Sequence, residues 1–138
     1  MSAHLKQKEE KLQHVLECLA EESAKGTPII VEGKKDIETL RTLGVQGKII
    51  SAKTGGKTRL DTISEIEETG AREIILLLDF DRTGKEWTAR LKQHMEHARI
   101  KSNTLFWAEL LGLVGKEVKD IEGLSAYIET LKKKTEKT

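Results

Sequence analysis

Asp79 and Asp81 are the residues whose types and spacing most directly suggest chemistry. They follow five aliphatic residues, Ile74 to Leu78, a pattern typical of a buried parallel strand. Ligands gather at the carboxyl ends of such strands, and residues i and i+2 of an extended chain point the same way. Two carboxylates held this close repel each other unless a cation lies between them. A partly exposed, oxygen-only pair suits Mg²⁺, with Mn²⁺ as a substitute.

A third acid, Glu32, ends the first expected strand. If the sheet reverses direction between the first and third strands, these strands are neighbours and Glu32 lies opposite the aspartates. Gly33 would let a metal or phosphate approach the backbone, close to the N–H groups that begin the next helix. Glu32, Asp79 and Asp81 are therefore the candidate metal ligands. Asp36, inside the first turn of that helix, is interpreted as a capping residue.

Each candidate ligand also has an ordinary structural interpretation. One of the two aspartates could simply cap the helix expected near Lys85. Glu32 could be no more than a helix-start residue that complements the helix dipole. Proximity in the folded chain is what separates these interpretations from a metal site.

Basic residues gather in the loops that follow the expected strands, on the same rim as the acids. The formal net charge is only +1, so this local distribution, not the overall charge, would attract nucleic acid. The alternative is that these residues are solvated helix starts. We call them the basic collar: Lys34, Lys35, Lys53, Lys57, Arg59, Arg82 and Lys85.

The composition excludes several classes of protein. A chain of 138 residues is most simply one domain. A single cysteine, Cys18, excludes a disulfide framework and a Cys-based zinc ribbon. No apolar stretch approaches the ~20 residues of a membrane span, and the N-terminus lacks the apolar core of a signal peptide. We therefore expect a cytoplasmic protein that does not act at a membrane.

Strand and helix patterns alternate along the chain, which predicts an α/β fold of about four mainly parallel strands with helices on both faces. We expect residues 1–26 to form an N-terminal amphipathic helix, from about Ala3 to Ser23, packed on a domain of residues 27–138. The expected strands are Pro28–Val31, Lys48–Ser51, Glu73–Leu78 and Ile100–Leu105. Further helices are expected over Lys35–Leu43, Ile121–Lys133 and, as a turn or two, Trp107–Leu113. Two more are expected between them, one marked by Leu60, Ile63 and Ile66 and one that buries Trp87, Leu91, Met95 and Ala98. The tail Lys132–Thr138 is expected to be frayed.

Two segments together resemble the motifs of the Toprim domain, the catalytic module of bacterial primases, topoisomerases and several nucleases. Ile29–Asp36 matches the family's hydrophobic strand plus Glu-Gly-x-x-Asp, and Leu77–Gly84 matches its Asp-x-Asp-x-x-Gly. The resemblance covers about Pro28–Leu131. In size and in the segment Lys119–Leu124, the chain is most similar to small stand-alone archaeal Toprim proteins, which resemble ribosomal RNA maturases and primases.

The resemblance implies a Toprim-type, Rossmann-like fold. It also implies that Glu32 is the general acid/base at the scissile phosphate and that Asp79 and Asp81 are Mg²⁺ ligands. Thr83 stands where some topoisomerase relatives have a third aspartate, so any second metal must be held differently. Tyr127 lies in the last expected helix, with no second domain to place it as a nucleophile, so a complete topoisomerase is not expected. A complete primase would need zinc-binding cysteines that are absent.

Three functional hypotheses follow. The first is a Mg²⁺-dependent nucleic-acid-processing enzyme that acts on phosphodiester bonds of RNA or DNA, as a nuclease, an RNA maturation factor or a primase-like protein. The second is a non-catalytic module that binds metal and nucleic acid within a larger protein or ribonucleoprotein assembly. The third is an aspartate-nucleophile phosphatase, because Asp79–Thr83 also fits Asp-x-Asp-x-Thr. That phosphatase family expects a later lysine and a further acidic loop.

Overall fold

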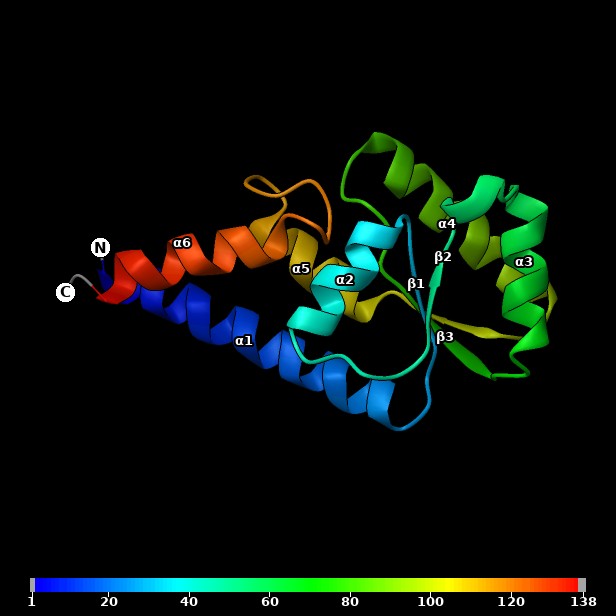
Figure 1. The fold of residues 1–138 in the computed structure, drawn as a ribbon, viewed down its shortest axis with the longest axis horizontal. Coiled ribbons are helices and arrows are strands. Elements are labelled where there is room, and N and C mark those ends of the chain that lie inside the picture. The colour runs from blue at the N-terminus through cyan, green and yellow to red at the C-terminus, as the bar shows by residue number, and fades with distance from the viewer. Residues whose placement is uncertain (1, 137–138) are drawn as a thin grey trace.

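The computed structural model describes residues 2–136 as an α/β fold in which one four-stranded sheet lies between two layers of helices (Figure 1). The strands are β1 (Ile29–Val31), β2 (Ile49–Ser51), β3 (Glu73–Leu76) and β4 (Lys101–Asn103). Their order is β2-β1-β3-β4, and each neighbouring pair is parallel. The predicted Rossmann-like α/β class is confirmed, and the sheet does reverse direction between β1 and β3.

The helices that follow the strands begin at one edge of the sheet. Helix α2 follows β1, α3 follows β2 after a short 3-10 turn, α4 follows β3 and α5 follows β4. Because parallel strands all end at the same edge, the starts of these helices also gather there. The bounds are α1 (Ser2–Ala24), α2 (Lys34–Thr42), η1 (Thr54–Gly56), α3 (Arg59–Glu68), α4 (Arg82–His97), α5 (Leu105–Val114) and α6 (Leu124–Glu136).

The central strands bury both of their faces, which explains their unbroken aliphatic runs. Successive side chains of a strand point to opposite faces. In β1, Ile29 and Val31 pack in the core formed with α1, α2, α5 and α6, whereas Ile30 packs in the core formed with α3 and α4. Ile74 to Leu78 alternate between the same two cores. Both layers therefore depend on apolar residues at every position of these strands.

Helices α1 and α6 lie side by side and extend together away from the sheet (Figure 1). The buried side chains of Leu12, Leu16 and Leu19 join α1 to the core that α5 and α6 share with the sheet. The Thr135 hydroxyl donates a hydrogen bond to Glu9 Oε1 across the pair, at 3.1 Å. The predicted N-terminal helix is present, and a domain boundary at residue 26 stays a prediction.

Two helices near the C-terminus differ from the prediction. Helix α5 has ten residues instead of a turn or two, because Phe106, Leu110 and Val114 recur at helical spacing and pack on the sheet. Helix α6 begins at Leu124, three residues later than expected. It continues to Glu136, so the predicted fraying is not seen over residues 132–136, whereas 137 and 138 lie outside the described residues.

One residue of a predicted buried helix stripe, Ala98, is exposed, and so is Leu60, which marks the predicted helix before it. Leu60, at the start of α3, is 74% exposed, and Ala98, just after α4, is also exposed. Both lie at helix ends, where the chain turns away from the sheet. Among residues 2–136, no helix is long and apolar enough to cross a membrane. The cytoplasmic location stays a prediction.

The shared core leads to a test of whether α1 belongs to the domain. Leu19 is fully buried, and Leu19→Ala should lower the free energy of unfolding by about 2–5 kcal/mol, because it removes apolar contacts and leaves a cavity. Leu60→Ala is the control and should change that free energy by less than about 0.5 kcal/mol. Urea unfolding followed by circular dichroism measures both. An earlier, separate transition of α1 would contradict the shared core.

Candidate metal centre

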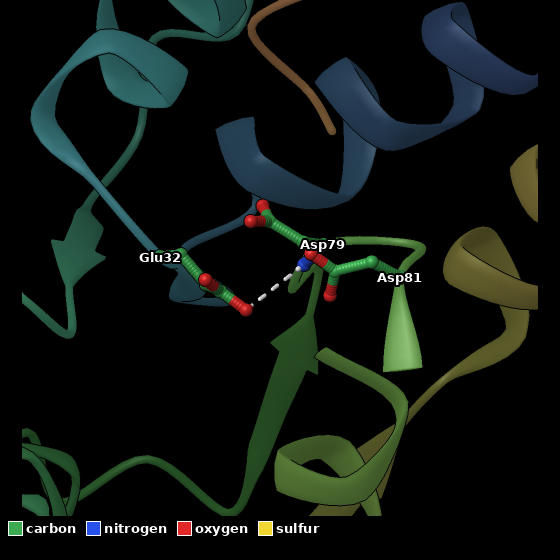
Figure 2. A group of neighbouring side chains, drawn as sticks. All are labelled: Glu32, Asp79 and Asp81. Carbon is green, nitrogen blue, oxygen red and sulfur yellow. Dashed lines mark hydrogen bonds between the residues drawn. The ribbon is translucent and has the colours of Figure 1, made fainter. Parts of the chain in front are cut away.

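Glu32, Asp79 and Asp81 converge at the carboxyl edge of β1 and β3 (Figure 2). One carboxylate oxygen of each residue lies within 4.8 Å of the others. The Glu32 side chain is buried, Asp79 is half-buried and Asp81 is exposed. The Asp79 backbone N–H donates a hydrogen bond to Glu32 Oε1 at 3.3 Å. The structure therefore brings together the three acids expected to bind metal, although metal binding itself stays a prediction.

The loop that carries the two aspartates is held from its opposite side. Between them Phe80 is buried, and its N–H donates to the Lys119 carbonyl at 2.7 Å. The Trp107 indole N–H donates to the Leu78 carbonyl at 2.9 Å, and its ring lies 6.4 Å from that of Phe80. With Phe80 held inward, both aspartates are free to face the sheet edge. The sequence did not predict these supports, because an aromatic side chain in a helix carries no signal of a distant carbonyl partner.

Asp81 also caps the helix that follows it. Its Oδ1 accepts a hydrogen bond from the Gly84 N–H at 2.8 Å, which makes Asp81 the N-cap of α4. The capping interpretation was therefore right for Asp81. The cap uses only one oxygen, so it does not exclude a metal ion at the carboxylate. Gly84 is required here because a Cβ on it would overlap the Asp79 carbonyl oxygen.

The electrostatics of the cluster favour a cation. Burial, followed by the adjacent Glu32 carboxylate, raises the pKa of Asp79 to about 8. Lys53 Nζ lies 3.0 Å from Glu32 Oε2, and this hydrogen bond raises the pKa of Lys53. A divalent ion would relieve the remaining repulsion among the carboxylates. Three carboxylate oxygens on a solvent-facing edge form a donor set that fits Mg²⁺ or Mn²⁺.

The basic collar is spread over the starts of α2, α3 and α4 and the loop before α3. Lys57 pairs with Glu65, and its Nζ also donates to a backbone carbonyl, that of Ser51, at 2.9 Å. Lys57 thus joins the loop to β2 and α3. Contact between the collar and nucleic acid stays a prediction for Lys34, Lys35, Lys53, Lys57, Arg59, Arg82 and Lys85.

A second acidic group consists of Asp36, Asp120 and Glu122. Asp36 is buried, and burial raises its pKa. Its Oδ2 accepts the Gly33 N–H at 2.9 Å and its Oδ1 accepts the Glu122 N–H at 2.8 Å. Since both oxygens bond to backbone, Asp36 joins α2 to the loop before α6. The predicted capping role of Asp36 is confirmed.

A family model described as the Toprim domain matches residues 27–110. The chain belongs to the Toprim family. A UPF0292 protein of Methanocaldococcus jannaschii is 41% identical over 120 residues, which are 86% of this chain and 91% of that relative. A UPF0292 protein of Methanosarcina acetivorans is 35% identical over 127 residues, which are 91% of this chain and 85% of the relative. The predicted resemblance to small archaeal Toprim proteins is confirmed.

A solved structure of an Aquifex aeolicus protein has the same fold as this Toprim protein. Its TM-score is 0.64 at 23% sequence identity, and the match covers 79% of this chain and 94% of that one. This likeness bears on the fold alone. Toprim domains bind divalent metal ions, and membership of the family together with the acidic cluster indicates a metal-dependent function related to nucleic acids.

The close approach of α4 to the Asp79 loop leads to a prediction for Gly84. Gly84→Ala should displace the Asp79 carbonyl and weaken Mn²⁺ binding about 10- to 100-fold, as expected when the support of a metal ligand is disturbed. Gly112→Ala in α5 is the matched control, because a Cβ there meets nothing within 4 Å. Isothermal titration with Mn²⁺ compares them. Equal affinity in the two variants would show that the loop tolerates the shift.

The raised pKa of Asp79 predicts how stability depends on pH in the metal-free protein. Between about pH 4 and pH 8, folded Asp79 holds a proton that the unfolded chain has lost, so stability should fall as the pH rises through this range. Asp79→Asn should fall less steeply, because it has no proton to lose. Urea unfolding in EDTA at pH 5.5, 7 and 8.5 measures both slopes. Parallel slopes would mean that Asp79 titrates normally.

Proposed function

We propose that this protein is a Mg²⁺-dependent phosphodiesterase that cleaves nucleic acid, as a nuclease or an RNA-processing enzyme. The observation that carries the proposal is the convergence of Glu32, Asp79 and Asp81 from the ends of two neighbouring strands. Acids that served only as helix caps would not need to meet. Asp81 alone is the cap, whereas Glu32 and Asp79 lie within 4.8 Å of it without capping α4.

The surroundings of the cluster fit a phosphate backbone. The collar residues Lys34 and Lys35 begin α2, and Arg82 and Lys85 lie in the first turn of α4, so cations follow both acidic segments directly in the chain. The N-terminal N–H groups of these helices face the same edge and favour anions. A polyanion could therefore approach an acidic centre in an otherwise near-neutral protein.

Asp79 and Asp81 would hold Mg²⁺, which neutralises charge on phosphate oxygens when it is bound. Glu32 would move a proton. As water adds to phosphorus and the bond from phosphorus to the leaving sugar oxygen breaks, one proton leaves the water and one reaches the sugar oxygen. Glu32 can take part in this exchange as general acid/base, since it lies in the cluster, with Lys53 Nζ 3.0 Å from its Oε2.

Cleavage assays on labelled substrates test the proposal. The protein should cleave at least one of structured RNA, single-stranded RNA, single-stranded DNA or nicked duplex when Mg²⁺ or Mn²⁺ is present. Asp79→Asn with Asp81→Asn should abolish cleavage. Glu32→Gln should lower turnover about 10²- to 10⁴-fold while substrate affinity changes far less. Glu122→Gln, in the second acidic group, is the matched control and should cleave normally.

Other outcomes would support the other hypotheses. Binding of nucleic acid without turnover in any metal would favour a non-catalytic module of a larger assembly. Hydrolysis of a small phosphomonoester that survives Glu32→Gln but not Asp79→Asn would favour the aspartate-nucleophile phosphatase.

A further inference from the structure

The Glu32 carboxylate is engaged on both of its oxygens. Oε1 accepts the Asp79 N–H at 3.3 Å, and Oε2 pairs with Lys53 Nζ at 3.0 Å. The Glu32 side chain is only 5% exposed, so these two contacts replace most of the water that it would otherwise bind. The ammonium of Lys53 therefore contacts the Glu32 oxygen that does not accept from the Asp79 N–H.

The backbone fixes where the Lys53 side chain begins, although that side chain is 60% exposed. Val31 pairs with Ser51 in the parallel ladder, and the ladder continues with the Lys53 N–H donating to the Glu32 carbonyl at 2.9 Å. Lys57 anchors the same loop through the Ser51 carbonyl. The base of the Lys53 side chain thus stands beside Glu32 at the sheet edge, unlike a lysine on a free surface loop.

The cluster has enough carboxylates for one divalent ion together with one ammonium. Among residues 2–136, the acidic group around Asp79 consists of Glu32, Asp79 and Asp81. One divalent ion and the ammonium of Lys53 together would balance the three negative charges of this group. Thr83, two residues after Asp81, offers only a neutral hydroxyl. Asp36 belongs to a separate group with Asp120 and Glu122, and backbone N–H groups bond to both of its oxygens.

We propose that the ammonium of Lys53 takes the place of a second metal ion, so that the centre binds one divalent cation through Asp79 and Asp81. Lys53 then acts as a fixed point charge for a phosphate oxygen beside Glu32, a role that suits a compact ammonium. This inference rests on the proposed function, since it assumes that the cluster binds a metal ion. It further specifies the number of ions and the residue that replaces the second.

Metal binding without substrate tests the inference. The unmodified protein should bind one Mn²⁺ per chain in isothermal titration and native mass spectrometry. Lys53→Met should bind Mn²⁺ on the order of tenfold more tightly, because a positive charge close to the ion is removed. Lys53→Arg keeps the charge and should match the unmodified protein within about twofold. Lys34→Met removes a nearby collar charge that has no contact with Glu32 and is the matched control, with a change below about twofold.

Each outcome bears on a different claim. Two Mn²⁺ ions per unmodified chain, or equal affinity in Lys53→Met and the unmodified protein, would overturn the role of Lys53 while leaving a metal-dependent enzyme intact. Equal tightening by Lys53→Met and Lys34→Met would also overturn it, because general electrostatics would then explain the effect. No Mn²⁺ binding, or binding that survives Asp79→Asn with Asp81→Asn, would defeat the proposed function itself.

Discussion

Parallel pairing of β1 with β3 is the constraint on which the rest of this protein depends. It places Glu32 against the backbone of Asp79, although the two are 47 residues apart in the chain. Pairing of this kind needs both strands to be buried on both faces, and the unbroken aliphatic runs of β1 and β3 meet that need. A rigid apolar sheet thereby holds three carboxylates at one edge, where their repulsion would otherwise drive them apart.

At the acidic edge, carboxyl groups are held close together and partly out of water inside a well-packed fold. Glu32 is buried, and Asp79 keeps a proton up to about pH 8. Lys53 and the Asp79 N–H offset the burial of Glu32, whereas Asp79 avoids repulsion by Glu32 only while it stays protonated. A site whose carboxylates are only partly neutralised by the protein is suited to bind a cation. Part of the binding free energy would come from neutralising these carboxylates.

Segments outside the matched Toprim region contact the loops that carry the acidic residues. The Lys119 carbonyl accepts from Phe80 in the aspartate loop, and the Glu122 N–H donates to Asp36 at the start of α2. One short stretch before α6 thus holds both loops that carry acids. Helices α1 and α6 pack together and fix this stretch on the sheet, which gives the N- and C-terminal helices a role in the geometry of the site.

Much of this protein was determined by local sequence. Aliphatic runs that end in acids predicted the strands, the candidate ligands and the family, because strand burial and motif spacing are local properties. Tertiary structure alone decided what those residues touch. The ion pair of Lys53 with Glu32 and the Trp107 support of Leu78 join segments that are distant in the chain. Such contacts depend on strand order and register, which a linear pattern does not contain.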